Sequence, residues 1–412
     1  MTRVLAIGID AAEPSLVRAM IDAGELPAMR ALLARGTWSR VESPAHIGSG
    51  AVWPSFITGR PAREHGIHSE WCWSPESMSL QRYSSARLTP QWRSFAGSLG
   101  LIDVPFAPFN GVARGFEISE WGAHDQLEGE TRGTIGPLPE HSFANRGVGG
   151  VKARGALAAS LIGGVDAAIV VFTEVHHASH EAWPDVREVI REVDRQIGML
   201  GQIAGDGAAV LVFSLHGMRP ALQVPEFLEQ LLIDAGFARR AGWSPRTLFA
   251  AAKRHAPPPL KKLYHRWTPA KTMHRLAQPT MLPAYDWNRT RAFSLPSDQH
   301  GWIRVNLAGR EARGIVALDQ YEPLCHELET LLRSHPLVDE VWRSGRTQFL
   351  PDLVIHWTPP HSPTTSRKVL TGQHSRDGFL LGRGVRVAAN IYAEEIYGLI
   401  AAAASEPEPR PD

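Results

Sequence analysis

The chain has 412 residues, enough for one large α/β domain or two ordinary domains, and its net charge of +1 indicates no particular charged partner. A content of 43% hydrophobic and 21% charged residues excludes general disorder. Two cysteines, Cys72 and Cys325, exclude a disulfide framework and favour a reducing compartment. The N-terminal residues lack a signal-peptide pattern, and no apolar stretch reaches the ~18–20 residues of a spanning helix. We therefore expect a cytoplasmic protein without a membrane span.

The first half of the chain alternates strand-like and helix-like patterns. Residues 3–10, RVLAIGID, form an apolar run that ends in an aspartate, and residues 14–36 show helical spacing of apolar side chains. Residues 167–175 and 208–217 are continuous apolar runs, typical of strands that are buried on both faces. Residues 179–205, between these runs, predict a long amphipathic helix. We expect an α/β fold with a doubly wound, mostly parallel sheet and helices on both faces.

The composition changes over residues 237–287. Residues 237–285 contain no Asp or Glu, whereas Lys and Arg recur, and three consecutive prolines interrupt a helical pattern. We expect a small basic helical cap inserted at 237–287, with 1–236 and 288–412 forming one catalytic core. The cap is either an electrostatic funnel for an anionic substrate or a solvated hairpin or subunit face.

Residues that bind metal ions recur where apolar runs end. Asp10 ends the first run, His216 ends a later one, and His374 lies in LTGQHSRDG. His176 and His180 are four residues apart, the spacing by which a helix presents two histidines to zinc. Imidazole nitrogens suit Zn²⁺, and a carboxylate adds a hard oxygen. Each residue alone is compatible with packing or capping, but together they predict a divalent-metal site at one sheet edge.

Ser49 precedes the apolar run AVWPSFI and is a natural helix N-cap. A helix start also offers free N–H groups and the positive end of the helix dipole, which suit phosphate oxygens. A serine hydroxyl needs a base or a metal to act as a nucleophile at neutral pH. No Gly-x-Ser-x-Gly elbow surrounds Ser49, which disfavours an α/β-hydrolase. Ser49 is therefore either a plain cap or a metal-activated nucleophile.

Six segments in chain order resemble the type I phosphodiesterase/nucleotide pyrophosphatase family of the alkaline phosphatase superfamily. They are AIGIDAAEP, SGAVWPSFITGRPAREHGIH, FTEVHHASHEAW, VFSLHGM, IRVNLAGREARGIV and GQHSRDGFLL. Within the second, TGRPAREHGIH is similar to the family signature TG-x-x-P-x-x-HGI. The resemblance implies an alkaline phosphatase-like fold, hydrolysis of phosphate esters through a covalent phosphoserine, and two metal ions, usually zinc.

The resemblance also implies roles for single residues. Ser49, nine residues before the Thr of the TG pair, matches the nucleophile, which in the family also binds a metal. The remaining ligand positions of the family fall on Asp10, His176, His180, His216 and His374.

The chain departs from the family pattern at two of the positions that bind metal. His176 stands where the family has Asp, which is tolerable because imidazole binds zinc well. Leu215 stands where the family has another Asp, and leucine cannot bind a metal, so we expect one or two ions. The second site then binds metal weakly, takes Glu13 or Glu174 as a substitute ligand, or is empty without substrate.

Two loops hold further residues that either line the substrate pocket or pack as ordinary loop residues. They are Trp121, His124 and Asp125 in SEWGAHD, and Asp298, His300 and Asn306 in PSDQHGWIRVN.

We expect a metal-dependent hydrolase of small anionic phosphate esters, acting on a phosphodiester or pyrophosphate bond, and leave a homo-oligomer open. One alternative is a phosphonate or other phosphoryl-transfer enzyme on the same scaffold. Another is a catalytically weakened anion-binding relative, which Leu215 would explain. A sulfatase is disfavoured because Ser49 lies outside a Cys/Ser-x-Pro-x-Arg motif. Specific nucleic-acid recognition is disfavoured because no recognised module accompanies the basic segment.

Overall fold

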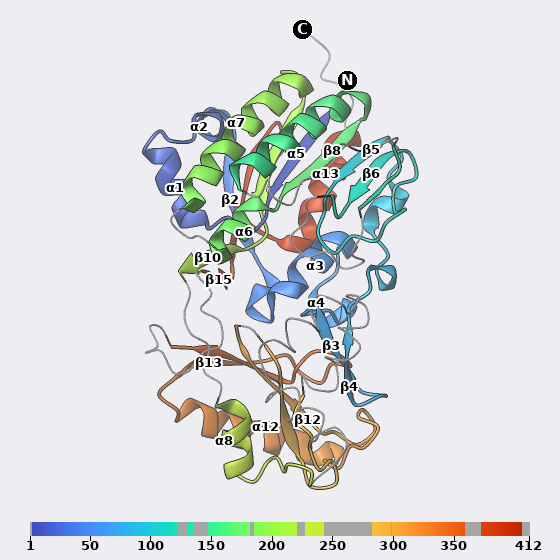
Figure 1. Ribbon diagram of the computed structural model, residues 1–412, viewed down its shortest axis with the longest axis vertical. Coiled ribbons are helices and arrows are strands. Elements are labelled where there is room, and N and C mark those ends of the chain that lie inside the picture. The colour runs from blue at the N-terminus through green and yellow to red at the C-terminus, as the bar shows by residue number, and fades with distance from the viewer. Residues whose placement is uncertain are drawn as a thin grey trace, which may run out of the picture. The chain divides into compact units, whose positions relative to one another are not determined.

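The chain divides into two compact units, which the computed structural model describes over most of their length (Figure 1). Unit 1 comprises Met1–His65, Ser84–Leu222 and Val369–Asp412, and unit 2 comprises Gly66–Tyr83 and Gln223–Lys368. The described residues are 2–121, 131–135, 138, 147–181, 185–220, 227–242, 282–297, 299–358 and 372–405.

Unit 1 is built on a nine-stranded sheet with the order β17-β2-β16-β9-β1-β8-β5-β6-β7. Its strands are β1 (Val4–Ile9), β2 (Thr37–Glu42), β5 (Leu99–Ile102), β6 (Gly115–Ser119), β7 (Arg132–Gly133), β8 (Ala167–Phe172), β9 (Ala209–Ser214), β16 (Asp377–Arg383) and β17 (Asn390–Tyr392). Strands β9, β1, β8, β5 and β6 are parallel to their neighbours in this run, whereas β16 is antiparallel to both β9 and β2. The predicted mostly parallel α/β sheet is therefore confirmed.

The three central strands form the apolar centre of unit 1. Every residue of β1, β8 and β9 is buried, as the continuous apolar runs predict. Strand β8 is shorter than the predicted run, because Glu174 and Val175 already belong to the following helix. Burial on both faces requires helices on both sides of the sheet. In Figure 1, α5 and α7 lie side by side in front of it and α13 lies behind.

The helices of unit 1 are shorter than the sequence pattern predicts. They are α1 (Pro14–Asp22), α2 (Pro27–Ala34), α3 (Val52–Thr58), α4 (Ala62–His65), α5 (Val148–Leu161), α6 (Glu174–Glu181), α7 (Val186–Ala204) and α13 (Ile396–Ser405). The predicted helical stretch 14–36 is two helices, because Gly24 adopts a φ of 77° just after α1 and so ends it. The predicted helix 179–205 covers the end of α6 and all of α7.

Unit 2 contains an antiparallel four-stranded sheet with the order β11-β12-β14-β13. Its elements are β3 (Trp71–Ser74), β4 (Ser79–Arg82), α8 (Leu228–Asp234), β11 (Ala292–Leu295), β12 (Gly301–Val305), α12 (Tyr321–Arg333), β13 (Val338–Arg343) and β14 (Leu353–Trp357). The short 3-10 turns of both units, beyond the one described with the site, are η1 (Pro44–His46), η3 (Ser85–Arg87), η4 (Gln91–Ser94), η5 (Ile162–Gly164), η7 (Leu318–Gln320) and η8 (Ala393–Glu395). Among the described residues, no helix combines the length and the apolar character needed to cross a membrane.

The boundaries of unit 2 differ from those expected for the inserted cap. Residues 288–412 are expected in the core from the sequence, but β11 to β14, which lie within this range, pair with one another and form their own sheet. Apolar alternation predicts a strand without naming its partner, which explains the difference. Most of the expected cap, residues 243–281, lies outside the described residues, so its helical character stays a prediction.

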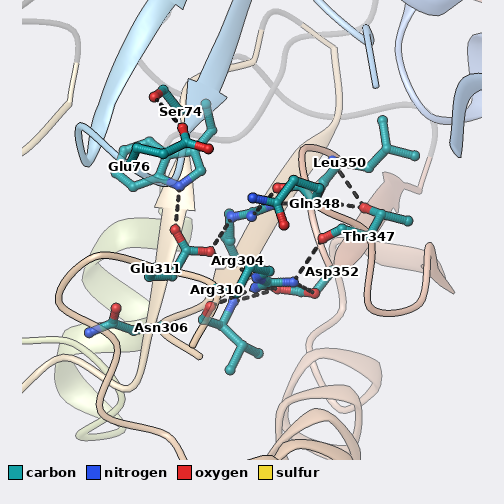
Figure 2. Close-up of polar contacts among 12 residues, drawn as sticks. Ser74, Glu76, Arg304, Asn306, Arg310, Glu311, Thr347, Gln348, Leu350 and Asp352 are labelled. Carbon is teal, nitrogen blue, oxygen red and sulfur yellow. Dashed lines mark hydrogen bonds and ion pairs between the residues drawn. The ribbon is translucent and has the colours of Figure 1, made fainter. Parts of the chain in front are cut away.

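A buried arginine organises the polar interior of unit 2 (Figure 2). Arg304 of β12 has no exposed side-chain surface, and its guanidinium donates to Glu311 Oε1 at 2.7 Å. The same group donates to the carbonyls of Gln348 and Leu350, each at 2.6 Å. The buried charge is thus paired and hydrogen-bonded, the condition under which proteins tolerate one.

A second arginine extends this set of contacts. Arg310 donates to Glu311 at 2.9 Å and to both carboxylate oxygens of Asp352 at 2.7 Å. Trp73 of β3 donates its indole N–H to Glu311 at 2.7 Å, and Tyr321 donates to Asp352 at 2.8 Å. We call Arg304, Arg310, Glu311 and Asp352 the unit 2 ion network. It contains two positive and two negative charges, so its formal net charge is zero.

Candidate metal centre

The three central strands of unit 1 end at one edge of the sheet. Register pairs Ile9 with Phe172 and Gly8 with Phe213, so β1, β8 and β9 finish level with one another. Asp10 follows β1, helix α6 follows β8, and His216 follows β9 by two residues. The carboxyl edge of parallel strands is where open α/β sheets bind ligands. The topology therefore brings the predicted ligand residues of three distant segments together.

Asp10 lies at the centre of this edge and is 3% exposed. Its Oδ2 is 2.9 Å from Nδ1 of His176, and its Oδ1 accepts a 2.9 Å hydrogen bond from the indole N–H of Trp53. The Nε2 atom of His216 is 3.5 Å from the same Oδ1. Burial disfavours ionisation of the carboxyl, but the charge interactions and hydrogen bonds of His176 and His216 outweigh burial and hold the pKa of Asp10 well below its usual range.

Helix α6 presents two histidines on one face. His176 and His180 are one turn apart, and their Nε2 atoms are separated by 3.0 Å. Nδ1 of His176 faces Asp10, so its Nε2 faces the second histidine. The sequence prediction that these two histidines share a helix face is confirmed.

His374 comes from a separate two-stranded sheet. Strand β15 (Gly372–Ser375) pairs with β10 (Gly217–Pro220), and the register sets His374 opposite Met218. The ring of His374 is 4.7 Å from that of His176 and 5.2 Å from that of His180, centroid to centroid. Burial, together with repulsion from the other histidines, lowers the pKa of His374 well below 6.5. At neutral pH its ring is therefore uncharged and able to bind a cation.

Together these three histidines have the composition of a zinc site. The ligand nitrogens of His176, His180 and His374 all lie within 4.8 Å of one another. Within the described part of the chain, no other group of three or more His, Cys, Asp or Glu side chains brings its ligand atoms this close together. Three imidazoles with a fourth position left for water or substrate are a donor set of catalytic zinc sites. The residues present therefore fit a divalent zinc-type ion.

His216 is buried beside the three histidines, with its ring 4.7 Å from that of His374. Its Nδ1 lies 3.2 Å from Nδ1 of His374 and 3.1 Å from the carbonyl of Gly217. Four imidazoles and one carboxylate thus lie together at this edge. We call His176, His180, His216, His374 and Asp10 the histidine centre.

Ser49 begins the 3-10 turn η2 (Ser49–Ala51), which leads into α3. Ser49 is not an N-cap, one of its two alternatives, because Gly48 caps η2 and Ala51 caps α3. Four residues after Ser49, the indole of Trp53 bonds to Asp10, so this helix start is anchored to the histidine centre. Ser49 is partly exposed, as a nucleophile must be. Its catalytic role stays a prediction.

The two acids considered as substitute ligands have other partners. Glu13 accepts a 2.7 Å hydrogen bond from Ser375, and the Glu174 carboxylate is held by Arg154 at 3.0 Å. Neither belongs to the group whose ligand atoms lie within 4.8 Å. Leu215 is 1% exposed and adds a buried apolar side chain to the edge where an acid was expected by resemblance.

The residues predicted for substrate binding belong to different units of the chain. Trp121 packs into the hydrophobic core of unit 1 and is 3% exposed, so the structure gives it a core position. His300 lies in unit 2, with its ring 5.2 Å from that of His356. Asn306 lies in unit 2 as well, where its amide donates to backbone carbonyls. The predicted residues outside the described ranges are His124, Asp125 and Asp298.

Two residues at the site were missed by the sequence analysis. Trp53 lies in an apolar run, where nothing indicates that its N–H meets a carboxylate. Arg154 is fully buried on α5, where it bonds to Asp103, Glu174 and Thr173. A lone arginine inside an apolar helical pattern was a usable signal, because a buried guanidinium requires acidic partners.

Comparison with protein families identifies one match. The model described as type I phosphodiesterase / nucleotide pyrophosphatase matches residues 4–301 of the chain. The match spans the strand that precedes Asp10, the Ser49 turn, α6 and the strand that precedes His216. A comparison with curated protein sequences finds no match.

Solved structures with the same fold cover nearly the whole chain. Phosphonoacetate hydrolase from Sinorhizobium meliloti, in complex with phosphonoacetate, is 14% identical, with a TM-score of 0.62 over 98% of this chain and 96% of its own. Murine ectonucleotide pyrophosphatase / phosphodiesterase 5 is 13% identical, with a TM-score of 0.54 over 100% and 97%. The human form of the latter is 12% identical, with a TM-score of 0.53 over 100% and 97%. At these identities the likeness shows the fold.

Proposed function

Because the chain belongs to the type I phosphodiesterase/nucleotide pyrophosphatase family and has the alkaline phosphatase-like fold, we propose that it hydrolyses small anionic phosphate esters at a phosphodiester or pyrophosphate bond. The observation that carries the proposal is the cluster of His176, His180 and His374, whose ligand atoms lie within 4.8 Å of one another. These three residues would hold a divalent ion, which we propose to be zinc. When bound, the ion supplies positive charge that stabilises the oxygens of the transferring phosphoryl group.

In this proposal Ser49 is the nucleophile. Its Oγ forms a bond to phosphorus, the bond between phosphorus and the leaving oxygen breaks, and the leaving group takes up a proton. Water then attacks the phosphoserine, the Oγ–P bond breaks, and the serine hydroxyl is regenerated.

The buried Leu215 supports a second candidate, a weakened relative that binds an anionic ligand with little or no turnover. A third candidate is cleavage of a phosphonate, the kind of compound present in the bacterial structure of similar fold. All three candidates use the same sheet edge, so the substrate and the rate distinguish them.

An assay of the zinc-loaded full chain tests the proposal. Bis(4-nitrophenyl) phosphate, 4-nitrophenyl phosphate, 4-nitrophenyl sulfate and phosphonoacetate are compared, and we expect the diester to turn over fastest. Ser49→Ala should lower that rate by about 10³-fold or more, because the nucleophile is lost. Ser94→Ala, at an exposed serine of unit 1, is the matched control and should keep the rate. No turnover of any ester, or a Ser49→Ala variant as active as the wild type, would refute the proposal.

A further inference from the structure

We propose that the histidine centre holds one metal ion and that Asp10 orients His176 instead of binding a second ion. The inference deepens the proposed function and rests on its metal site. It concerns the number of ions and the task of Asp10. The family resemblance implies two ions and makes Asp10 a metal ligand, so the inference differs from it on both points.

The carboxylate of Asp10 is already engaged by protein donors. Oδ1 accepts the indole N–H of Trp53 at 2.9 Å, and Oδ2 lies 2.9 Å from Nδ1 of His176. Asp10 is 3% exposed, so these bonds form away from bulk water, where they are hard to exchange. An ion bound through Oδ2 would share that oxygen with His176 and compete with its hydrogen bond.

The hydrogen positions on His176 also favour an orienting role for Asp10. An ionised carboxylate only accepts hydrogen bonds, so Nδ1 of His176 carries the hydrogen that faces Asp10. In the neutral ring Nε2 then carries a lone pair, and this atom lies 3.0 Å from Nε2 of His180. Metal-binding histidines commonly donate their other N–H to a carboxylate, which fixes the tautomer and the ring orientation. Asp10 has this relation to His176.

The histidine centre offers few ligands for a second ion. Leu215 offers none, and Glu13 and Glu174 bond to Ser375 and Arg154. His216 is the remaining imidazole, and its Nε2 is 3.5 Å from Asp10 Oδ1. Over the described ranges of the chain, no second group of three His, Cys, Asp or Glu ligand atoms is assembled. Catalytic zinc sites use three protein ligands, so a second ion would need the Ser49 hydroxyl in addition to His216 and a shared Asp10 oxygen.

Metal titration of the full chain tests the inference. The protein is stripped with a chelator, titrated with Zn²⁺ or Co²⁺ alone, desalted and analysed for metal content. The wild type should bind one ion per chain. Asp10→Asn keeps an acceptor oxygen for His176 and should also bind one ion, with affinity lowered by about 10- to 100-fold. Asp10→Ala removes the acceptor and should bind more weakly than Asp10→Asn.

Cobalt spectra separate an orienting role from a ligand role. If Asp10 is not a ligand, Co²⁺ in Asp10→Asn should show the same visible bands as Co²⁺ in the wild type. Ser94→Ala, at an exposed serine of unit 1 outside the histidine centre, is the control and should keep both the stoichiometry and the bands. Circular dichroism confirms that each variant is folded before titration.

Different results overturn the inference and the proposed function. Two ions per wild-type chain, with one lost in Asp10→Asn, would overturn the inference while leaving a two-metal hydrolase intact. One ion per chain with no hydrolysis of bis(4-nitrophenyl) phosphate would support the inference and refute the proposed function. A wild type that binds no ion would overturn both.

Discussion

The two units bury two polar clusters of opposite character. In the unit 2 ion network, two guanidinium groups face two carboxylates, and the contacts close the cluster on itself (Figure 2). In the histidine centre of unit 1, four imidazoles surround a single carboxylate. The first cluster has matched charges, whereas the second has more nitrogen ligands than its one acid can satisfy. A cluster whose charges are matched by one another contributes to the folded structure, whereas a cluster rich in imidazole nitrogens is suited to bind a cation.

The largest expected effect is the loss of a histidine ligand. His180→Ala should abolish stoichiometric zinc binding and lower diester hydrolysis by about 10³-fold, because only two ligands remain at the site. Metal analysis after desalting and the rate assay measure the two effects. His177→Ala, on the same helix but outside the cluster, should keep its zinc. If both variants lose zinc equally, the effect comes from α6 itself and not from the ligand.

The matching change in the unit 2 ion network should affect stability rather than metal binding. Arg304→Met removes the ion pair between Arg304 and the Glu311 carboxylate, which has no exposed side-chain surface. Breaking a buried pair from one side costs about 3 kcal/mol or more. Urea unfolding measures this loss, and zinc content should remain at the wild-type level. Arg304→Met/Glu311→Leu should recover part of the loss, and a double variant no more stable than the single one would argue against the pair.

Glu117 in β6 shows what burial does to an acid that accepts no hydrogen bond from a guanidinium in the described part of the chain. It is 1% exposed, and burial raises its pKa from 4.5 to about 7, although backbone N–H groups, such as that of Gly111, oppose the shift. The folded state holds the proton more tightly than the unfolded chain. The stability contributed by Glu117 is therefore complete below about pH 4.5 and is lost as the pH rises through about 7.

The shift corresponds to about 3 kcal/mol between these pH values. Unfolding free energies at pH 5 and pH 8 should differ less in Glu117→Gln than in the wild type, because glutamine is neutral throughout and keeps an acceptor oxygen for Gly111. An identical pH dependence in the two proteins would show that the Glu117 carboxyl ionises as easily in the fold as in the unfolded chain.

The smallest expected effect comes from restoring an acid beside His216. Leu215→Asp adds the missing carboxylate and should raise zinc content above one ion per chain, with affinity for the added ion about 10-fold weaker or more than for the first. Leu215→Asn, similar in size but uncharged, is the matched control and should stay at one ion. If Leu215→Asp also binds only one ion, the bonds of Asp10 are by themselves enough to exclude a second.

The sequence predicts the architecture of unit 1 well, because its central strands are continuous apolar runs, which are typical of strands buried on both faces of a sheet. The runs at β1, β8 and β9 are buried along their whole length, as predicted. Breaks in the helices were harder to foresee. Gly24 ends α1 through its positive φ, but a glycine inside a helical pattern does not by itself mark a stop.

For the candidate site, the residue types were predictable and their contacts were not. His176, His180 and His374 are brought together as expected, since strand ends and helix spacing bring such residues to one edge. The bond between Trp53 and Asp10 depends on how α3 packs against β1, and sequence spacing does not encode that packing. The separate sheet of unit 2 could not be predicted for a similar reason, because tertiary structure decides which strands far apart in the chain pair with one another.

Anomalous diffraction at the zinc absorption edge, from crystals of the full chain grown with zinc, tests the central claim most directly. The account predicts one strong peak per chain, about 2.0–2.1 Å from Nε2 of His176 and from one ring nitrogen each of His180 and His374. Asp10 should remain hydrogen-bonded to Nδ1 of His176. Two peaks with an Asp10 oxygen bound to one of them, or no peak among the three histidines, would contradict the account.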